Sequence, residues 1–276
     1  MRTSTAAFQL TRPLNVAIAM LSVLIAVMIT RVDFHWLPVV LACLSAGLIM
    51  AGGNTINDYF DIDIDRINKP QRPLPSGSIS SNAARLLAYL EFIAGNFLAV
   101  FISDAAFLMA LFFTALNYWY SARLKRIALW GNLAVSLSTA AAFVYGALAV
   151  GNPAAGIFPA ILAFLFHFAR EIIKDMEDVA GDQINGADTL PIRYGMRPAI
   201  RLVWAIFAAL LIATIIPFSL GDYGRIYFSI VVIGVWPVIA FVSVRIFQTS
   251  QPDVLNKLSN LLKLDMLIGL IALFFR

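Results

Sequence analysis

The sequence predicts an all-α, polytopic membrane protein: a bundle of nine transmembrane helices with Asp-rich segments at its cytoplasmic side. Of its 276 residues, 61% are hydrophobic and 13% are charged, whereas about 25% are charged in soluble domains. The mean hydropathy is +0.83. A helix needs roughly 20 apolar residues to cross a bilayer core, and the chain contains nine runs of about that length. We expect residues 1–276 to form a single integral-membrane domain.

The expected helices follow one another through short connections, with two exceptions. In order they cover about 14–30, 36–56, 84–103, 105–121, 129–150, 156–173, 199–218, 226–246 and 258–275. The two long connections are roughly 57–83 and 174–198. Together with Glu171, just before the second connection, they hold 10 of the 16 acidic residues. Function is therefore expected to be concentrated in these two connections.

The distribution of Lys and Arg predicts the orientation of the bundle. With the N-terminus inside, 17 of these residues lie at cytoplasmic ends and three lie outside, namely Arg31, Arg225 and Arg276. Cytoplasmic loops carry the excess of positive charge in membrane proteins, so we expect an integral protein of the cell (inner) membrane with both acidic connections in the cytoplasm. Because the positive charges are spread over loop ends, the net charge of +4 does not indicate a nucleic-acid partner.

The first acidic connection opens with four carboxylates in nine residues. On a helix, Asn57, Asp61 and Asp65 recur every four residues and share one face. Asp63 lies off this face and is expected in solvent or behind the ligands. Three prolines and Gly77 then forbid a continued helix and predict a stiff loop, which presents Arg66, Lys69 and Arg72 beside the carboxylates.

The second acidic connection repeats this pattern at Asp178 and Asp182. Five residues of the first connection match the second at a constant offset of 117 positions, which suggests an internal duplication. The matched pairs are Asp58 and Asp175, Asp61 and Asp178, Asp65 and Asp182, Ile67 and Ile184, and Asn68 and Asn185.

The two acidic faces predict a site for a hard divalent cation. All candidate ligands are oxygen donors, His35 and His167 lie elsewhere, and the single cysteine, Cys43, falls within an apolar run. This donor set favours Mg²⁺ or Mn²⁺ over Zn²⁺. Because Mg²⁺ takes few carboxylates and completes its shell with water and substrate phosphates, we expect the two faces to hold one diphosphate, with Arg72, Lys125 and Lys174 neutralising the rest of its charge.

These motifs resemble the UbiA superfamily of intramembrane prenyltransferases. The likeness rests on Asn57-Asp58-x-x-Asp61-x-x-x-Asp65, Arg72-Pro73-Leu74-Pro75-Ser76-Gly77, Tyr120-Ser121-Ala122-Arg123-Leu124-Lys125 and Asp178-x-x-x-Asp182. It implies that Asn57, Asp61 and Asp65 hold one Mg²⁺ and that Asp178 and Asp182 hold a second. It further implies that Arg72, Lys125, Lys174 and Arg12 contact an isoprenyl diphosphate, and that Tyr120 stabilises the carbocation through its ring.

Within the superfamily, the stretch from Arg170 to Asp182 followed by Thr189-Leu190-Pro191-Ile192 is most similar to the geranylgeranylglyceryl phosphate geranylgeranyltransferases. This implies transfer of a geranylgeranyl group from its diphosphate to a lipid-like acceptor in ether-phospholipid synthesis. An aromatic or chlorophyllide acceptor remains an alternative. A secondary transporter is the non-enzyme alternative, since membrane acids and an internal repeat are also transporter features. A CDP-alcohol phosphotransferase is disfavoured because the Asp-Gly-x-x-Ala-Arg opening is absent.

Overall fold

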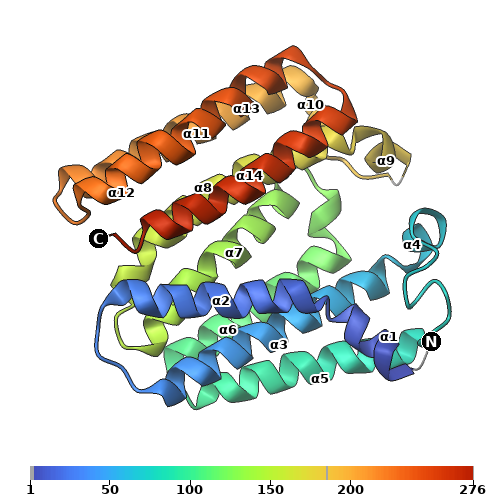
Figure 1. Cartoon of the computed structure of the whole chain (residues 1–276). Coiled ribbons are helices and arrows are strands. Elements are labelled where there is room, and N and C mark those ends of the chain that lie inside the picture. The colour runs from blue at the N-terminus through green and yellow to red at the C-terminus, as the bar shows by residue number, and fades with distance from the viewer. Residues whose placement is uncertain (1–2, 185, 276) are drawn as a thin grey trace. The chain divides into compact units, whose positions relative to one another are not determined.

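Helices, most of them long and apolar, make up most of the described part of the chain, residues 3–184 and 186–275 of this computed structural model (Figure 1). Within these residues there is no β-strand, and a single isolated bridge joins Ile127 to Asp188. The predictions that involve Arg2, Asn185 and Arg276 lie outside the described residues. The chain divides into two compact units, Met1–Leu124 with Ala141–Ile157, and Lys125–Ala140 with Phe158–Arg276.

The first unit is built around one central helix. It contains α1 (Thr3–Leu10), α2 (Pro13–Thr30), α3 (Trp36–Phe60), α4 (Ile62–Asn68), α5 (Ser81–Val100) and α6 (Asp104–Ala122), with the end of α7 (Trp130–Ala149). Helix α3 packs against α2, α5 and α6. Glycines let these helices approach closely, as is common in membranes: the position of a Cβ on Gly95 of α5 is only 3.0 Å from the Ser45 carbonyl oxygen on α3.

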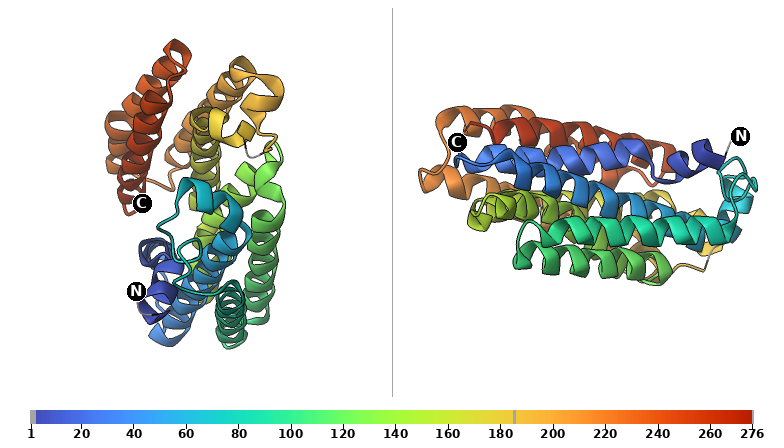
Figure 2. Two further views of the ribbon diagram at one scale, coloured as in Figure 1. Left: turned by 90° about the vertical axis from the view of Figure 1, so that its right-hand side faces the viewer. Right: turned by 90° about the horizontal axis from the view of Figure 1, so that it is seen from below.

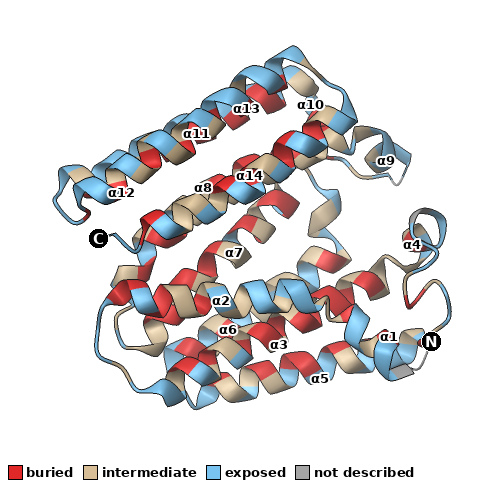
Figure 3. Cartoon of the chain, in the orientation of Figure 1, coloured by how far each residue is buried: buried red, intermediate tan, exposed pale blue. Residues whose placement is uncertain are grey.

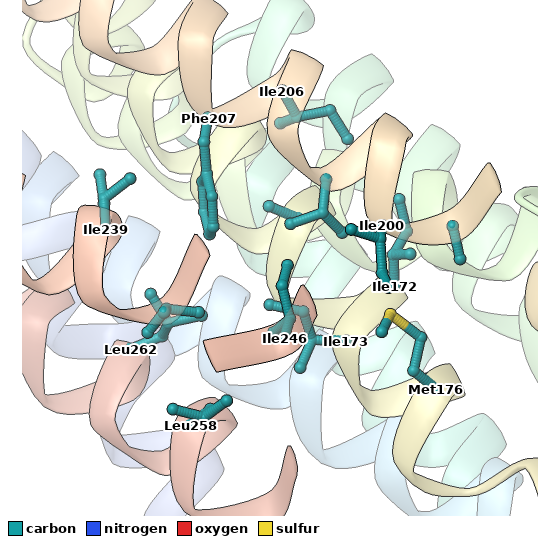
Figure 4. Packing of buried hydrophobic residues seen from close by; sticks show 14 of the residues in the cluster. Ile172, Ile173, Met176, Ile200, Ile206, Phe207, Ile239, Ile246, Leu258 and Leu262 are labelled. Carbon is teal, nitrogen blue, oxygen red and sulfur yellow. The ribbon is translucent and has the colours of Figure 1, made fainter. Parts of the chain in front are cut away.

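The second unit packs its helices around a separate apolar core. It contains most of α8 (Pro153–Glu177), then α9 (Val179–Ile184), α10 (Leu190–Tyr194), α11 (Met196–Ser219), α12 (Arg225–Ile230), α13 (Trp236–Gln248) and α14 (Pro252–Ala272). A π-helical turn, Val231–Val235, joins α12 to α13 and packs against α14. Figure 4 shows Ile172 and Ile173 of α8 among Phe207, Ile246 and Leu262 in this core. Two further views of the ribbon are given in Figure 2.

Among the described residues, eight helices are long and apolar enough to cross a membrane: α2, α3, α5, α6, α7, α8, α11 and the segment Arg225–Gln248. Buried residues alternate with exposed ones along most of the long helices, and many apolar side chains stay exposed (Figure 3). The prediction of nine spans is therefore not confirmed. The ninth, 258–275, corresponds to α14, which carries Asp253, Lys257, Lys263 and Asp265 and is not among the eight.

The backbone repeats the offset of 117 residues that the acids show in the sequence. Helices α2 and α7 begin at residues 13 and 130, and α3 and α8 cover 36–60 and 153–177. One residue before each of α2 and α7, Arg12 and Leu129 adopt positive φ angles of 51° and 66°. Because side chains rarely adopt this conformation, its recurrence at matched positions supports the internal duplication.

Candidate functional site

The first acid set lies where α3 gives way to α4. Helix α3 runs four residues beyond its expected end, to Phe60, and Asp61 separates it from α4. The helical hydrogen-bond pattern continues through this junction, since Asp61 N donates to Asn57 O at 3.0 Å and Asp65 N donates to Asp61 O at 2.8 Å. Asn57, Asp61 and Asp65 therefore follow one another at intervals of one turn, as the sequence predicts.

Two arginines neutralise two buried carboxylates beside this junction. Asp58 and Asp65 are each 4% exposed. Arg72 Nη1 lies 2.7 Å from Asp65 Oδ2 and 3.3 Å from Asp58 Oδ1, and Arg12 Nη2 pairs with the same Asp58 oxygen. The structure thus brings together three predicted site residues, Arg12, Arg72 and Asp65. It adds Asp58, which the sequence reasoning matched to Asp175 but did not assign to the site.

The Pro-rich loop holds Arg72 in this position. Helix α4 ends at Asn68, before the first proline, and Gly77 turns the chain with a φ of +73°. Leu74 anchors the loop because its side chain is buried against Ala6 and Leu10 of α1. The helix therefore ends before the prolines, as predicted, and among the described ion pairs Arg72 is the one cation of this loop that contacts the buried carboxylates. Arg66 instead forms an exposed pair with Asp63.

The second acid set lies at the corresponding junction of α8 and α9. Asp178 N donates to Lys174 O, and Asp182 N donates to Asp178 O, both at 2.9 Å. Asp178 is exposed and Asp182 is half-buried. Burial, and secondarily the negative charge of Asp178, raise the pKa of Asp182 to about 6, against the opposing effect of the Lys174 ammonium. Two carboxylates that repel each other in this way provide a suitable place for a cation.

The acids and bases that precede this junction are paired with one another. Glu171 lies between two cations: its Oε1 is 3.1 Å from Arg170 Nη1 and its Oε2 is 2.9 Å from Lys174 Nζ. Arg170 Nε also donates to the carbonyl oxygen of Ser259 on α14. Asp175 accepts a hydrogen bond of 2.9 Å from Asn132 on α7. The sequence reasoning gave Asn132 no role, and no local pattern marks it.

The remaining two predicted residues lie at the end of α6 and just after it. Tyr120 lies in the last turn of α6, is half-buried and belongs to the first unit. Lys125 lies in a short 3₁₀ turn, Leu124–Arg126, is half-buried and belongs to the second unit.

The donor chemistry of both acid sets fits a hard divalent cation. Each offers carboxylate or amide oxygens, and within either unit no three described His, Cys, Asp or Glu side chains lie close enough to hold a metal by themselves. A cation bound here would therefore need further ligands from water or substrate. This is how Mg²⁺ is usually bound, through one or two carboxylates and substrate phosphates.

Comparison with known proteins agrees with this chemistry. A model of the UbiA prenyltransferase family matches residues 18–267. A digeranylgeranylglyceryl phosphate synthase from Methanopyrus kandleri is 38% identical over 266 residues, which is 96% of each chain. A solved structure described as "Structural and mechanistic insights into the biosynthesis of Digeranylgeranylglyceryl phosphate synthase in membranes" is 30% identical, with a TM-score of 0.87 over 99% of this chain and 98% of that one.

A UbiA homologue from Archaeoglobus fulgidus, solved bound to DMAPP and Mg²⁺, has the same fold. Its TM-score is 0.69 at 23% identity, over 97% of this chain and 98% of that one. Family model, full-length relative and fold agree, and the chain belongs to the UbiA prenyltransferase family.

Proposed function

We propose that this chain transfers a geranylgeranyl group from geranylgeranyl diphosphate to geranylgeranylglyceryl phosphate and so forms digeranylgeranylglyceryl phosphate. Membership of a prenyltransferase family removes the transporter and phosphotransferase alternatives. The acceptor is proposed from relatives named digeranylgeranylglyceryl phosphate synthase that align over nearly the whole chain.

The observation that carries the proposal is the cluster at the end of α3. Buried Asp58 and Asp65 and the guanidinium groups of Arg12 and Arg72 lie together there. Asp58 directly follows Asn57, and Asp65 lies one turn after Asp61. Oxygen donors suit a divalent cation, and guanidinium groups suit phosphate oxygens. A metal-bound diphosphate needs both kinds of group in one place.

In the proposed reaction the allylic C–O bond breaks and its electron pair leaves with the diphosphate. The acceptor hydroxyl oxygen then bonds to the allylic carbon and loses its proton to solvent or a base. Arg72, Lys125, Lys174 and Arg12 would bind the phosphate oxygens and stabilise their growing charge. Tyr120 would stabilise the allylic cation through its ring.

The residues proposed to hold two Mg²⁺ ions are Asn57, Asp61 and Asp65 for one, and Asp178 and Asp182 for the other. When bound, Mg²⁺ supplies charge stabilisation to the leaving diphosphate. The Mg²⁺ bound to the Archaeoglobus fulgidus homologue and the oxygen-only donors of this chain support this choice of metal.

The protein is an integral membrane protein, as the eight long apolar helices of its described residues and its family indicate. We further propose that it lies in the cell (inner) membrane as one functional domain, with its N-terminus and both acid sets in the cytoplasm. The 17 to 3 distribution of Lys and Arg supports this orientation.

The test is an assay of the purified full-length protein with geranylgeranyl diphosphate and geranylgeranylglyceryl phosphate, with products identified by mass spectrometry. We expect the doubly prenylated glyceryl phosphate, loss of turnover with excess chelator and recovery with Mg²⁺. Failure to form this product, with efficient prenylation of 4-hydroxybenzoate, homogentisate or a chlorophyllide, would reject the acceptor and retain the family. Full activity in excess chelator would reject the metal.

A further inference from the structure

The salt bridge between Arg72 and Asp65 must open before either residue can take its proposed role in the reaction. Arg72 is proposed to bind the diphosphate, and Asp65 is proposed to bind a divalent metal. In the structure they bind each other, with Arg72 Nη1 2.7 Å from Asp65 Oδ2. The first acid set is therefore closed by a guanidinium group of the chain itself.

Asp58 would keep a cation if this closure opened. Asp58 pairs with both Arg72 and Arg12. If Arg72 moves to a phosphate, Asp58 still pairs with Arg12, but in the described part of the first unit no second arginine pairs with Asp65. Of these two carboxylates, only Asp65 then needs a new cation to neutralise its charge.

The binding of a metal ion to Asp65 and the departure of Arg72 are coupled electrostatically. Asp65 is 4% exposed, and a buried carboxylate without a cation is strongly unfavourable. A divalent metal that approaches while Arg72 is still in place is repelled by the guanidinium charge. The anion on Arg72 and the metal on Asp65 therefore favour each other, and this coupling is reciprocal.

The second acid set has no such closure. Lys174, one helical turn before Asp178, donates to Glu171 at 2.9 Å, and Asp178 is exposed. No arginine pairs with Asp178 or Asp182 among the described ion pairs. A metal that binds there has no guanidinium group to displace.

We propose that Arg72 closes the ligand set of Asn57, Asp61 and Asp65 against divalent metal until a diphosphate takes its guanidinium group, whereas Asp178 and Asp182 bind metal without diphosphate. The two metal positions then fill in a fixed order. This inference rests on the proposed function, because it assigns the same residues to the same metals and diphosphate.

The experiment counts Mn²⁺ ions bound per chain by electron paramagnetic resonance, on the purified full-length protein without diphosphate. Wild type should bind one Mn²⁺. Arg72→Gln, which removes the charge, should bind two, whereas Arg72→Lys, which keeps it, should bind one. Arg66→Gln is the matched control: it removes an exposed arginine of the same segment that pairs with Asp63, and it should bind one.

Further variants identify the two positions. Asp182→Asn should remove the single ion of the wild type, and Arg72→Gln combined with Asp65→Asn should return the count from two to one. Two ions bound to wild type, or one ion bound to a folded Arg72→Gln protein, would overturn the inference. Thermal unfolding of each variant establishes that it is folded.

A second measurement does not depend on Arg72→Gln. The probe is the thiolo analogue of geranylgeranyl diphosphate, which resists ionisation. With this analogue wild type should bind one Mn²⁺ more than Asp65→Asn, and without it the two proteins should bind equal numbers. Equal numbers in both conditions would contradict the inference. Absence of Mn²⁺ binding in every form would instead reject the metal part of the proposed function.

Discussion

Asn132 on α7 donates a hydrogen bond of 2.9 Å from its side-chain amide to the Asp175 carboxylate on α8. Asp175 occupies the position that matches Asp58 at the offset of 117 residues, but the two carboxylates have different partners. Asp58 has two arginines, whereas Asp175 has a neutral amide. Asn132 is 7% exposed, so this bond fixes the end of α8, from which the second acid set follows.

Replacing Asn132 with leucine should destabilise the protein by about 1–3 kcal/mol, because a largely desolvated carboxylate loses its donor. Thermal or denaturant unfolding in detergent measures this change. The control is Asn256→Leu, which breaks the hydrogen bond between exposed Asn256 and Glu177 and should change stability by less than about 0.5 kcal/mol. Equal effects of the two variants would show that the bond to Asp175 does not hold α8.

Removing a ligand from either acid set should lower the turnover number. We expect Asp61→Ala and Asp182→Ala each to reduce kcat by roughly a hundredfold or more, since each removes charge stabilisation from the leaving diphosphate. Asp63→Ala is the matched control, because Asp63 lies in the same segment but is exposed and pairs with Arg66. Steady-state kinetics with both substrates give the result. Near-normal turnover by either ligand variant would remove that set from the catalytic site.

Close packing of α7 on α2 should make Gly146 intolerant of a side chain. A Cβ at this position would overlap the carbonyl oxygen of Val23 and lie 2.8 Å from the Ala26 Cβ. Gly146→Ala should therefore destabilise the protein by about 1–3 kcal/mol through overpacking. Gly269→Ala serves as the control, since its Cβ would meet only Val235 Cγ2, at 4.0 Å. If both variants unfold at the wild-type temperature, the two helices do not pack as closely as described.

The charge distribution predicts which loops face the cytoplasm. Gln71 and Gln183 are exposed beside the two acid sets, and Asp222 is exposed in the turn between α11 and α12. Single cysteines at these positions, in a Cys43→Ser background, can be labelled in intact cells with a reagent that does not cross membranes. Only the cysteine at 222 should react. Labelling at 71 or 183 from outside would reverse the orientation.

The helices could be predicted from the sequence because apolar runs of membrane length have few alternative folds. The predicted ends of the helices were less accurate where a helix continues from an apolar run into acidic residues. Helices α3 and α8 were expected to end at 56 and 173 but extend to Phe60 and Glu177. Helix α1 was not predicted, because it has only eight residues and is held by the packing of Ala6 and Leu10 against Leu74.

The spacing of the candidate ligands along the helix could also be predicted, but the ion pairs of the neighbouring residues could not. Local spacing places Asn57, Asp61 and Asp65 on successive turns, and the backbone bonds agree. The pair between Arg12 and Asp58 joins residues 46 positions apart, and Arg12 has a positive φ. No local pattern encodes such a contact. The match of Asp58 with Asp175 at the offset of 117 residues was the one signal in the sequence that these two positions have a structural or functional role.

The most direct test of the account offers two acceptors to one enzyme. Purified protein is given geranylgeranyl diphosphate, Mg²⁺ and equal concentrations of geranylgeranylglyceryl phosphate and 4-hydroxybenzoate, and both products are quantified from the same vessel. The ratio of products reports the ratio of kcat/KM values, which measures specificity between competing substrates. We predict that digeranylgeranylglyceryl phosphate exceeds the prenylated benzoate by at least about a hundredfold, since a site that binds a substrate phosphate is left with unpaired charges when that group is missing. A ratio near one, or an excess of the prenylated benzoate, would contradict the proposed acceptor.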